Sequence, residues 1–415
     1  AIATAKAEVF AVETAPGQSV AAAVSVASNA AFKKAFQSQD AVQVTQIVDA
    51  ALGSINTIDC TVPVACAALN RAECRYTPKT CGACNIGFAG PSGDSNVLCS
   101  SAASVVLPVG ASCSSNSSCV TNICGAGKCQ DISKKCIDSC NGNGVCVFTD
   151  VNQNVVSKCS ILDRSCSASC VCSASRHGRS CQLTLARYKE LVSLRETLCV
   201  NIYKTLALQD VSLDVVRSRA ESIGNALIDI DQISDAAVQN CTEALVTTLI
   251  AYPTLACEGS SSPLITKALS NILQKRTLLS EDLFERLSTA SVSFASGCQD
   301  NTAVGETPLE LISENLRMTT AMLDPDAAAG YVLPAAQDAF EILAQVANPS
   351  VTLGSDATTG SSGASLPSRT AAGISISRKA SSTPPACRAW GCSTVRARTA
   401  GRCWRRKTVL RRPNP

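Results

Sequence analysis

Histidine, aromatic residues and long apolar runs are scarce in this sequence. Its 415 residues include one histidine, His177, and 4% aromatic residues. Because aromatic side chains are so few, burial must depend on Ala, Leu, Val and Ser. No apolar run reaches the roughly 18 residues that a membrane-spanning helix needs, so no transmembrane helix is predicted.

The scarcity of histidine also argues against hydrolytic catalysis, because hydrolytic triads need a base. His177 lies between Arg176 and Arg179 in a short turn closed by cysteines, without an obvious partner. No Gly-x-Ser-x-Gly elbow, glycine-rich dinucleotide loop or His-Glu-x-x-His helix occurs. The acidic pair Glu281–Asp282 is explained by its place at a helix start. We therefore expect a non-enzymatic protein with no catalytic residue, no metal and no cofactor.

Acidic residues are missing from the end of the chain. None follows Asp356, whereas 12 of the 36 Lys and Arg residues do. The remainder is acidic, with 24 basic against 33 acidic residues, so nucleic-acid binding is not expected. Residues 354–415 are predicted to be a low-complexity, basic, disordered tail. The tail is either a basic arm for polyanions or an out-of-frame end of the sequence, and we favour the second.

Cysteine is abundant. The 25 cysteines are clustered at short spacings, which favours disulfides in an oxidising compartment and an extracellular or cell-surface location. Zinc is the competing interpretation, but zinc sites usually recruit histidine. The sequence begins at Ala1 without a signal segment. We therefore expect a fragment of a longer protein, with the membrane anchor in the missing part.

The composition changes along the chain predict a multi-domain protein with small disulfide-rich modules, a following all-α domain and a disordered tail. The predicted segments are an Ala-rich helical segment ending a larger upstream domain (1–59), a cysteine-rich module (60–99), a linker with a small cysteine knot (100–130), an EGF-like module (131–182), a five-helix domain (183–300), the start of a β subdomain (301–353) and the tail (354–415).

The module at 60–99 has glycine-punctuated turns and six cysteines. Cys81-Gly-Ala-Cys84 superficially matches a redox motif, but that motif needs a buried strand before it and a helix after it. We therefore interpret Cys81 and Cys84 as cysteines of structural disulfides. The segment LNRAEC…TCGACNIGFAGPSGDSNVLC resembles cysteine-rich modules of protist surface proteins.

The stretch from Cys136 to Cys181 holds eight cysteines and almost no large apolar side chains, so covalent cross-links must stabilise it. Its spacing resembles an EGF-like module, keeping Gly178 but having Ser175-Arg176 where the family prefers Gly and an aromatic residue. The resemblance implies three disulfides, Cys136–Cys146, Cys140–Cys170 and Cys172–Cys181. The additional pair Cys159–Cys166 most simply closes an insertion loop.

Calcium binding by this module is not expected. Calcium-binding EGF-like modules carry an acidic pattern before the first cysteine, and calcium needs several oxygen ligands. Here the segment is Asp131-Ile-Ser-Lys-Lys135, with lysine where a carboxylate is wanted.

Residues 183–300 have a helical period with N-cap candidates at Ser212, Ser234, Ser262 and Ser280; Asp40 is a further candidate in the first segment. Cys199, Cys241, Cys257 and Cys298 can form two bridges in three ways. Glycosylation sequons occur at Asn116 and Asn240, although a bridge at Cys241 would hinder the second.

Two further resemblances concern the flanking regions. AFQSQDAVQVTQIVDAALGSIN resembles the helical end of the REJ-type region of polycystin-like surface proteins. The five helices followed by PLELISENLRMTTAMLDPDAAAGYVLPAAQDAF resemble the helical half and first strands of a GAIN-type domain, without its His-Leu-Thr/Ser cleavage motif. Cleavage is therefore not predicted.

Together these features predict a fragment of a cell-surface adhesion or receptor ectodomain, whose disulfide-rich modules act as spacers or interaction units. The partners would be other proteins or surface glycans. One alternative is a secreted disulfide-rich inhibitor or soluble ligand. Another is the regulatory ectodomain of a polycystin-like channel.

Overall fold

The computed structural model describes most of the chain up to Met322 and four short strands beyond it. The described ranges are 18–56, 58–61, 65–75, 77–91, 93–101, 106–150, 154–163, 166–208, 212–313, 315–322, 332–333, 351–352, 370–376 and 392–395.

The predicted fold class is confirmed: a cysteine-rich region of short strands is followed by a helical region. The α-helices in the described residues are α1 (Val20–Gln37), α2 (Ala41–Ile55), α3 (Leu185–Lys204), α4 (Leu213–Ala226), α5 (Asp235–Ala251), α6 (Pro253–Cys257), α7 (Ser261–Gln274) and α8 (Glu281–Asp300). The sequence predicts five of the helices after residue 183, and α6 is an additional one. It is a single short turn with proline at its start, too short for a periodic signal.

Most of the predicted caps fix the helix starts. Asp40, Ser212, Ser234 and Ser280 each accept a hydrogen bond from the backbone N–H three residues on. Ser262 does not cap a helix, and this prediction is wrong. Helix α7 already begins at Ser261, with Ser260 at the N-cap and no side-chain hydrogen bond there. Pro263 therefore lies inside the first turn, where its missing N–H breaks no helical hydrogen bond.

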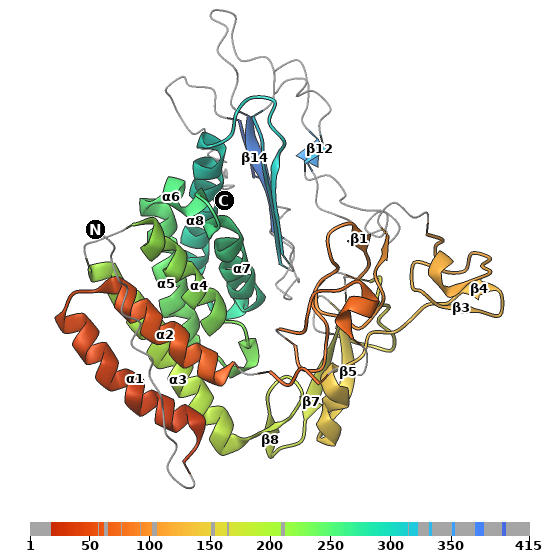
Figure 1. Ribbon diagram of the computed structural model, residues 1–415, viewed down its shortest axis with the longest axis horizontal. Coiled ribbons are helices and arrows are strands. Elements are labelled where there is room, and N and C mark those ends of the chain that lie inside the picture. Colours follow the sequence, from red (N-terminus) through yellow and green to blue (C-terminus); the bar gives the residue numbers. More distant parts are fainter. Residues whose placement is uncertain are drawn as a thin grey trace, which may run out of the picture.

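The first two helices belong to the same hydrophobic core as the later ones. Val44 and Val48 of α2 are fully buried and share one core with Val216 of α4 and Leu198 of α3. The sequence segmentation places 1–59 apart from 183–300, whereas α1 and α2 pack on α3 and α4. The cysteine-rich residues between α2 and α3 therefore form an insertion into one helical domain. Figure 1 shows this insertion, the arm (residues 56–184), beside the helices.

The arm has little regular structure. Its strands are β1 (Phe88–Ala89), β2 (Ser100–Ser101), β3 (Cys124–Gly125), β4 (Lys128–Cys129), β5 (Gly144–Asp150), β6 (Val155–Val156), β7 (Cys166–Cys172), β8 (Arg176–His177) and β9 (Leu183–Thr184). Its 3-10 turns are η1 (Cys66–Leu69), η2 (Asn116–Ser118) and η3 (Ile137–Gly142). The largest sheet has the order β6-β5-β7 and is antiparallel, and its β5–β7 pairing runs from Gly144–Cys172 to Asp150–Cys166.

A small sheet follows α8. Strands β10 (Leu309–Ile312), β11 (Leu316–Thr320), β14 (Thr370–Ile376) and β15 (Cys392–Val395) pair in that order, all antiparallel. Leu316 and Met318 of β11 extend the helical core. Strands β12 (Val332–Leu333) and β13 (Val351–Thr352) form a separate pair. The predicted tail (354–415) otherwise lies outside the described residues.

Short 3-10 turns connect the helices: η4 (Thr205–Ala207), η5 (Ile230–Gln232) and η6 (Arg276–Leu278). Among the described residues, no helix combines the length and the apolar character that crossing a membrane requires.

Candidate functional site

Eleven disulfides join described cysteines and use 22 of the 25 cysteines in the sequence. Each bridge stays within one unit of the chain: 60–99, 113–129, 136–181 or 199–298. In the third unit the pairs are Cys136–Cys146, Cys140–Cys170, Cys159–Cys166 and Cys172–Cys181. Three of these are the pairs that the EGF-like resemblance implies, and Cys159–Cys166 is the additional bridge expected for the insertion loop. In the helical domain, where three arrangements were open, Cys199 bonds Cys241 and Cys257 bonds Cys298.

The β5–β7 hairpin is pressed against the last bridge of this unit. A Cβ atom on Gly144 would lie 2.7 Å from Cys181 Sγ and 2.7 Å from the Val171 carbonyl oxygen. Glycine is therefore required at this position by close approach of backbone and sulfur. Gly178, inside the loop that Cys172–Cys181 closes, has φ +87°, which glycine adopts without strain.

A left-handed turn lies at the start of the same unit. Four consecutive non-glycine residues, Asp138 to Asn141, have φ between 48° and 57°. This conformation costs roughly 1–2 kcal/mol per residue for L-amino acids. The bridge from Cys140 to Cys170 ties the turn to β7, and Asp138 pairs with Lys79 of the first unit (60–99) at 3.2 Å. Cross-linking and this ion pair thus hold a backbone that would otherwise relax.

The segment before Cys136 contains an ammonium group at a position where carbonyl oxygens converge. Lys134 Nζ donates to the carbonyl oxygens of Asp163 at 2.6 Å and Cys166 at 2.7 Å. Asp131 accepts a hydrogen bond from Ser160 Oγ at 2.5 Å. Lys134 and Asp131 therefore both brace the loop that Cys159–Cys166 closes.

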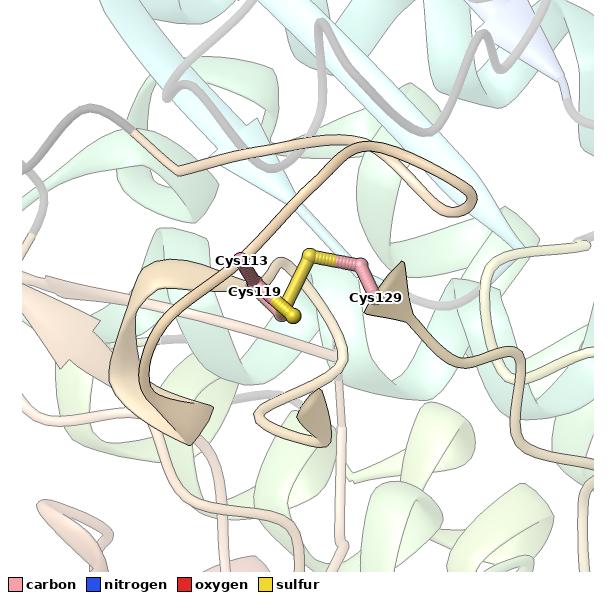
Figure 2. A group of neighbouring side chains, drawn as sticks. All are labelled: Cys113, Cys119 and Cys129. Carbon is pink, nitrogen blue, oxygen red and sulfur yellow. A yellow bond between two sulfur atoms is a disulfide. The ribbon is translucent and has the colours of Figure 1, made fainter. Parts of the chain in front are cut away.

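Among the described residues, sulfur atoms cluster closely enough in two places to suggest metal sites, but each of these sulfur atoms is in a disulfide. Cys113, Cys119 and Cys129 lie within 4.8 Å of one another, and Figure 2 shows the Cys119–Cys129 bond beside Cys113. Cys113 itself bonds Cys124. Zinc ligation requires thiolates, which these bonded sulfurs do not offer. The second cluster, Cys136, Cys140 and Cys170, is bonded in the same way.

The Cys-Gly-Ala-Cys sequence of the first unit is not a redox pair. Cys81 bonds Cys66, and Cys84 bonds Cys99. The centre of this unit is Arg71, which is 2% exposed and donates to the carbonyl oxygens of Gly82, Pro91, Gly93 and Val97. Burial lowers the pKa of this guanidinium to about 10. It serves as an internal hydrogen-bond donor for loops that have no sheet partners.

The arm contacts the helical domain near both of its ends, through hydrogen bonds at one end and ring stacking at the other. At one end Asn56 accepts from Arg195 at 2.5 Å and donates to the Asn225 carbonyl oxygen at 3.1 Å. At the other, the His177 ring stacks on Tyr188 with centroids 4.8 Å apart. These contacts fix the arm at two separate points of the helical domain.

Several buried polar atoms at this junction have no hydrogen-bond partner among the described residues: His177 Nε2, Arg195 Nε, Asp229 Oδ1 and Gln232 Oε1. Burial raises the pKa of Asp229, and the nearby Arg195 and Arg179 oppose this effect. The pKa of Tyr188 is also raised, first by burial and then by Asp231 and Asp229. His177 therefore belongs to the packing between two units.

One face of the β6-β5-β7 sheet carries no charged side chain, and its residues are exposed or half-buried. Alternation along the strands and the strand register place seven residues on this valine face: Val145, Val147, Thr149, Val155, Ser167, Ser169 and Val171. Val145, Val155 and Val171 are 67%, 76% and 57% exposed. The opposite face holds Cys146 and Cys170 and their bridges.

The two sequons differ in their surroundings. Asn116 is exposed in η2, and its Oδ1 accepts from the Cys124 N–H at 2.8 Å. Asn240 lies within α5, where its Nδ2 donates to the Ala236 carbonyl oxygen at 2.8 Å and Thr242 is fully buried. Only the Asn116 sequon is presented to solvent by the folded chain.

A groove of about 370 Å³ lies between α1 and α3. It is lined by Asn29, Phe32, Lys33, Phe36, Glu196, Thr197, Val200, Asn201 and Lys204. The sequence did not identify these residues as a set, because the two walls are separated by the whole arm. The only signal in the sequence was the i, i+4 spacing of Asn29 with Lys33 and of Val200 with Lys204. This spacing places each pair on one face of its helix.

No family model, curated protein or solved structure matches this chain.

Proposed function

We propose that this chain is part of the extracellular region of a cell-surface adhesion or receptor protein, without enzymatic activity. The arm would act as a spacer and contact unit carried by the helical domain. The observation that supports this proposal is the insertion itself: nine disulfides brace a chain segment whose two ends are both fixed on the helices. Such bridges persist in oxidising compartments.

The arm's third unit, residues 131–182, fits an EGF-like module. The first-to-third, second-to-fourth and fifth-to-sixth pairing supports this assignment, with Cys159–Cys166 closing an added loop. Helix α2, before the arm, covers most of the stretch that resembles a REJ-type region, and the helices after the arm with the β10–β11 hairpin fit the GAIN-type resemblance. A regulatory ectodomain of a polycystin-like channel stays within this proposal as a more specific version.

The arm would contribute a rigid structure. Its disulfides limit local unfolding, and the ion pair between Lys79 and Asp138 links the first and third units at 3.2 Å. Exposed ion pairs of this kind are worth at most about 1 kcal/mol, so orientation depends mainly on the two fixed ends. A fixed arm holds its tip at a constant distance from the helical domain, which suits presentation of a contact surface.

The valine face is the contact surface that we assign to a protein partner. It is uncharged and rich in β-branched side chains, which suits burial against apolar protein surface. A three-stranded face of this size covers roughly 300 Å², below the ~800 Å² per partner of stable complexes. Weak individual contacts multiplied over many copies, as in adhesion, are consistent with such an area.

The test is cell binding by a secreted, purified chain displayed as a tetramer. We expect surface binding that falls at least about tenfold when Val145→Asp and Val171→Asp are combined, because two charges would be desolvated. The matched control is Ile250→Asp, an exposed apolar position (48%) on α5. Absence of binding, or equal loss in the control, contradicts the proposal. Stoichiometric inhibition of a protease by the monomer would instead favour the secreted-inhibitor alternative.

A further inference from the structure

The groove between α1 and α3 has the chemistry of a ligand site separate from the arm. Its volume of about 370 Å³ is within the roughly 300–1,000 Å³ of small-molecule sites. Such sites are mostly apolar, whereas six of the nine residues lining this groove are polar or charged. A ligand that fits it must therefore carry many hydrogen-bonding groups.

The charge of the groove favours an anion. Lys33 projects from α1 and Lys204 from α3, and both are exposed. The only acid in the lining is Glu196, which accepts a hydrogen bond from Ser234 Oγ at 2.6 Å. One cation from each wall leaves a net charge of +1, suited to a single carboxylate held between them.

Neutral polar groups lie beside these charges. Asn201 is 6% exposed, and its Nδ2 donates to the Thr197 carbonyl oxygen at 2.9 Å. Among the described residues, no group donates to its Oδ1, so this acceptor is available to a ligand hydroxyl. Asn29 supplies a second amide from the opposite helix. Half-buried Phe36 adds an apolar side chain on the same wall, whereas Phe32 is 3% exposed and belongs mainly to the helical core.

We propose that this groove binds an acidic sugar residue, such as a uronic or sialic acid unit of a surface glycan. Its carboxylate would pair with Lys33 and Lys204, its hydroxyls with the two asparagines, and its C–H face with Phe36. This mixture of two cations, two amides and a small apolar area favours a sugar over two other acidic ligands. A fatty acid would need a mostly apolar lining, and the phosphates of a nucleotide would need more cations. The site deepens the proposed function by naming a second class of partner, and it rests on that proposal only for the cell-surface setting.

The test is ligand-observed NMR and calorimetry with the purified full chain. The probes are N-acetylneuraminic acid and glucuronic acid, compared with neutral glucose and a capped Asp-Asp peptide. We expect both acidic sugars to bind about tenfold more tightly than glucose, because their carboxylate would pair with two ammonium groups that glucose cannot use. Lys33→Ala and Lys204→Ala should each weaken acidic-sugar binding about fivefold or more. Lys34→Ala, an exposed neighbour outside the groove, should leave it unchanged.

Three results would overturn the proposal: no binding of either acidic sugar, equal binding of glucose, or an equal loss in Lys34→Ala. Tighter binding of the acidic peptide would assign the groove to a protein ligand instead. Because purified protein is used, these failures are distinct from failure of the adhesion role. Lys33→Ala is expected to leave valine-face binding intact, and the Val145→Asp, Val171→Asp variant to leave sugar binding intact.

Discussion

Gly297 of α8 lies against the backbone of α6 and leaves no space for a side chain. A Cβ atom there would overlap the Pro253 carbonyl group and approach the Thr254 nitrogen to 2.8 Å. Gly53, in contrast, is exposed on α2 with no atom within 4 Å of a Cβ position. Replacing Gly297 therefore tests helix packing, whereas replacing Gly53 tests only the helix propensity of the backbone.

We expect Gly297→Ala to lower the free energy of unfolding by about 2 kcal/mol, because α6 and α8 must move apart. Gly53→Ala should raise it by roughly 0.5–1 kcal/mol, because alanine favours the helix. Denaturant titration of the two variants measures both effects. A Gly297→Ala variant as stable as the original chain would contradict the close α6–α8 contact.

Protonation of Asp49 should affect stability between acidic and neutral pH. Burial raises its pKa from 3.8 to about 7; the Ser222 hydroxyl opposes this effect, and nearby Glu221 adds to it. The folded chain therefore holds this proton after the unfolded chain has lost it. Stability should fall as pH rises from about 4 to about 7 and then level off.

Asp49→Asn removes this ionisation and keeps an acceptor for Ser222. We expect the variant to be more stable than the original chain at pH 8, by an amount of order 2 kcal/mol, and to lose much of the slope between pH 4 and 7. Unfolding free energies measured over this pH range check the prediction. An unchanged slope in the variant would show that Asp49 is not the residue responsible.

The sequence predicted residues whose role is local far better than those that act across the fold. Four of the five proposed caps bond within one turn of their own helix. Asp49 and Ser222 bond across 173 positions, and no local pattern reports such a contact. Arg71 was not identified either, because its four carbonyl partners belong to irregular loops.

At the scale of elements, the bridges differ in the length of chain that they close. Cys199–Cys241 ties α3 to α5 over a separation of 42 residues, and Cys257–Cys298 ties α6 to α8 over 41. Cys159–Cys166 closes a separation of only 7. Longer loops lose more unfolded-state entropy when they are cross-linked, so the helical bridges should stabilise more.

Replacing Cys199 and Cys241 together by alanine should lower the free energy of unfolding by about 4 kcal/mol. The same double replacement at Cys159 and Cys166 should cost about 2 kcal/mol by the chain-entropy relation. Thermal or denaturant unfolding under non-reducing conditions compares them. A larger loss for the short loop would contradict the entropic account of these bridges.

Helix existence was predictable where apolar periodicity extended over several turns, as in α3, α4 and α8. Helix α6 escaped prediction because five residues cannot display a period, and α7 began earlier than its Ser-Pro pair suggested. The sheet after α8 was expected only as the start of a β subdomain. Its pairing of β11 with β14 joins residues far apart in the chain, which local alternation does not reveal.

At the scale of the whole molecule, the insertion was the feature that the sequence did not show. Abrupt changes of composition near residues 60 and 183 marked the ends of the arm. They do not show that the helices on its two sides share one core, because that contact depends on complementary apolar faces separated by the arm. The groove between α1 and α3, a site between those two sides, was missed for the same reason.

The most direct test of the inserted, disulfide-braced arm is peptide mapping of the secreted chain without reduction, with alkylation of free thiols. We expect cross-linked peptides for the eleven pairs, including Cys172–Cys181 and Cys199–Cys241. We also expect no bridge between the arm and the helical domain. Alkylation of most cysteines without reductant, or bridges that join the arm to the helices, would contradict this architecture.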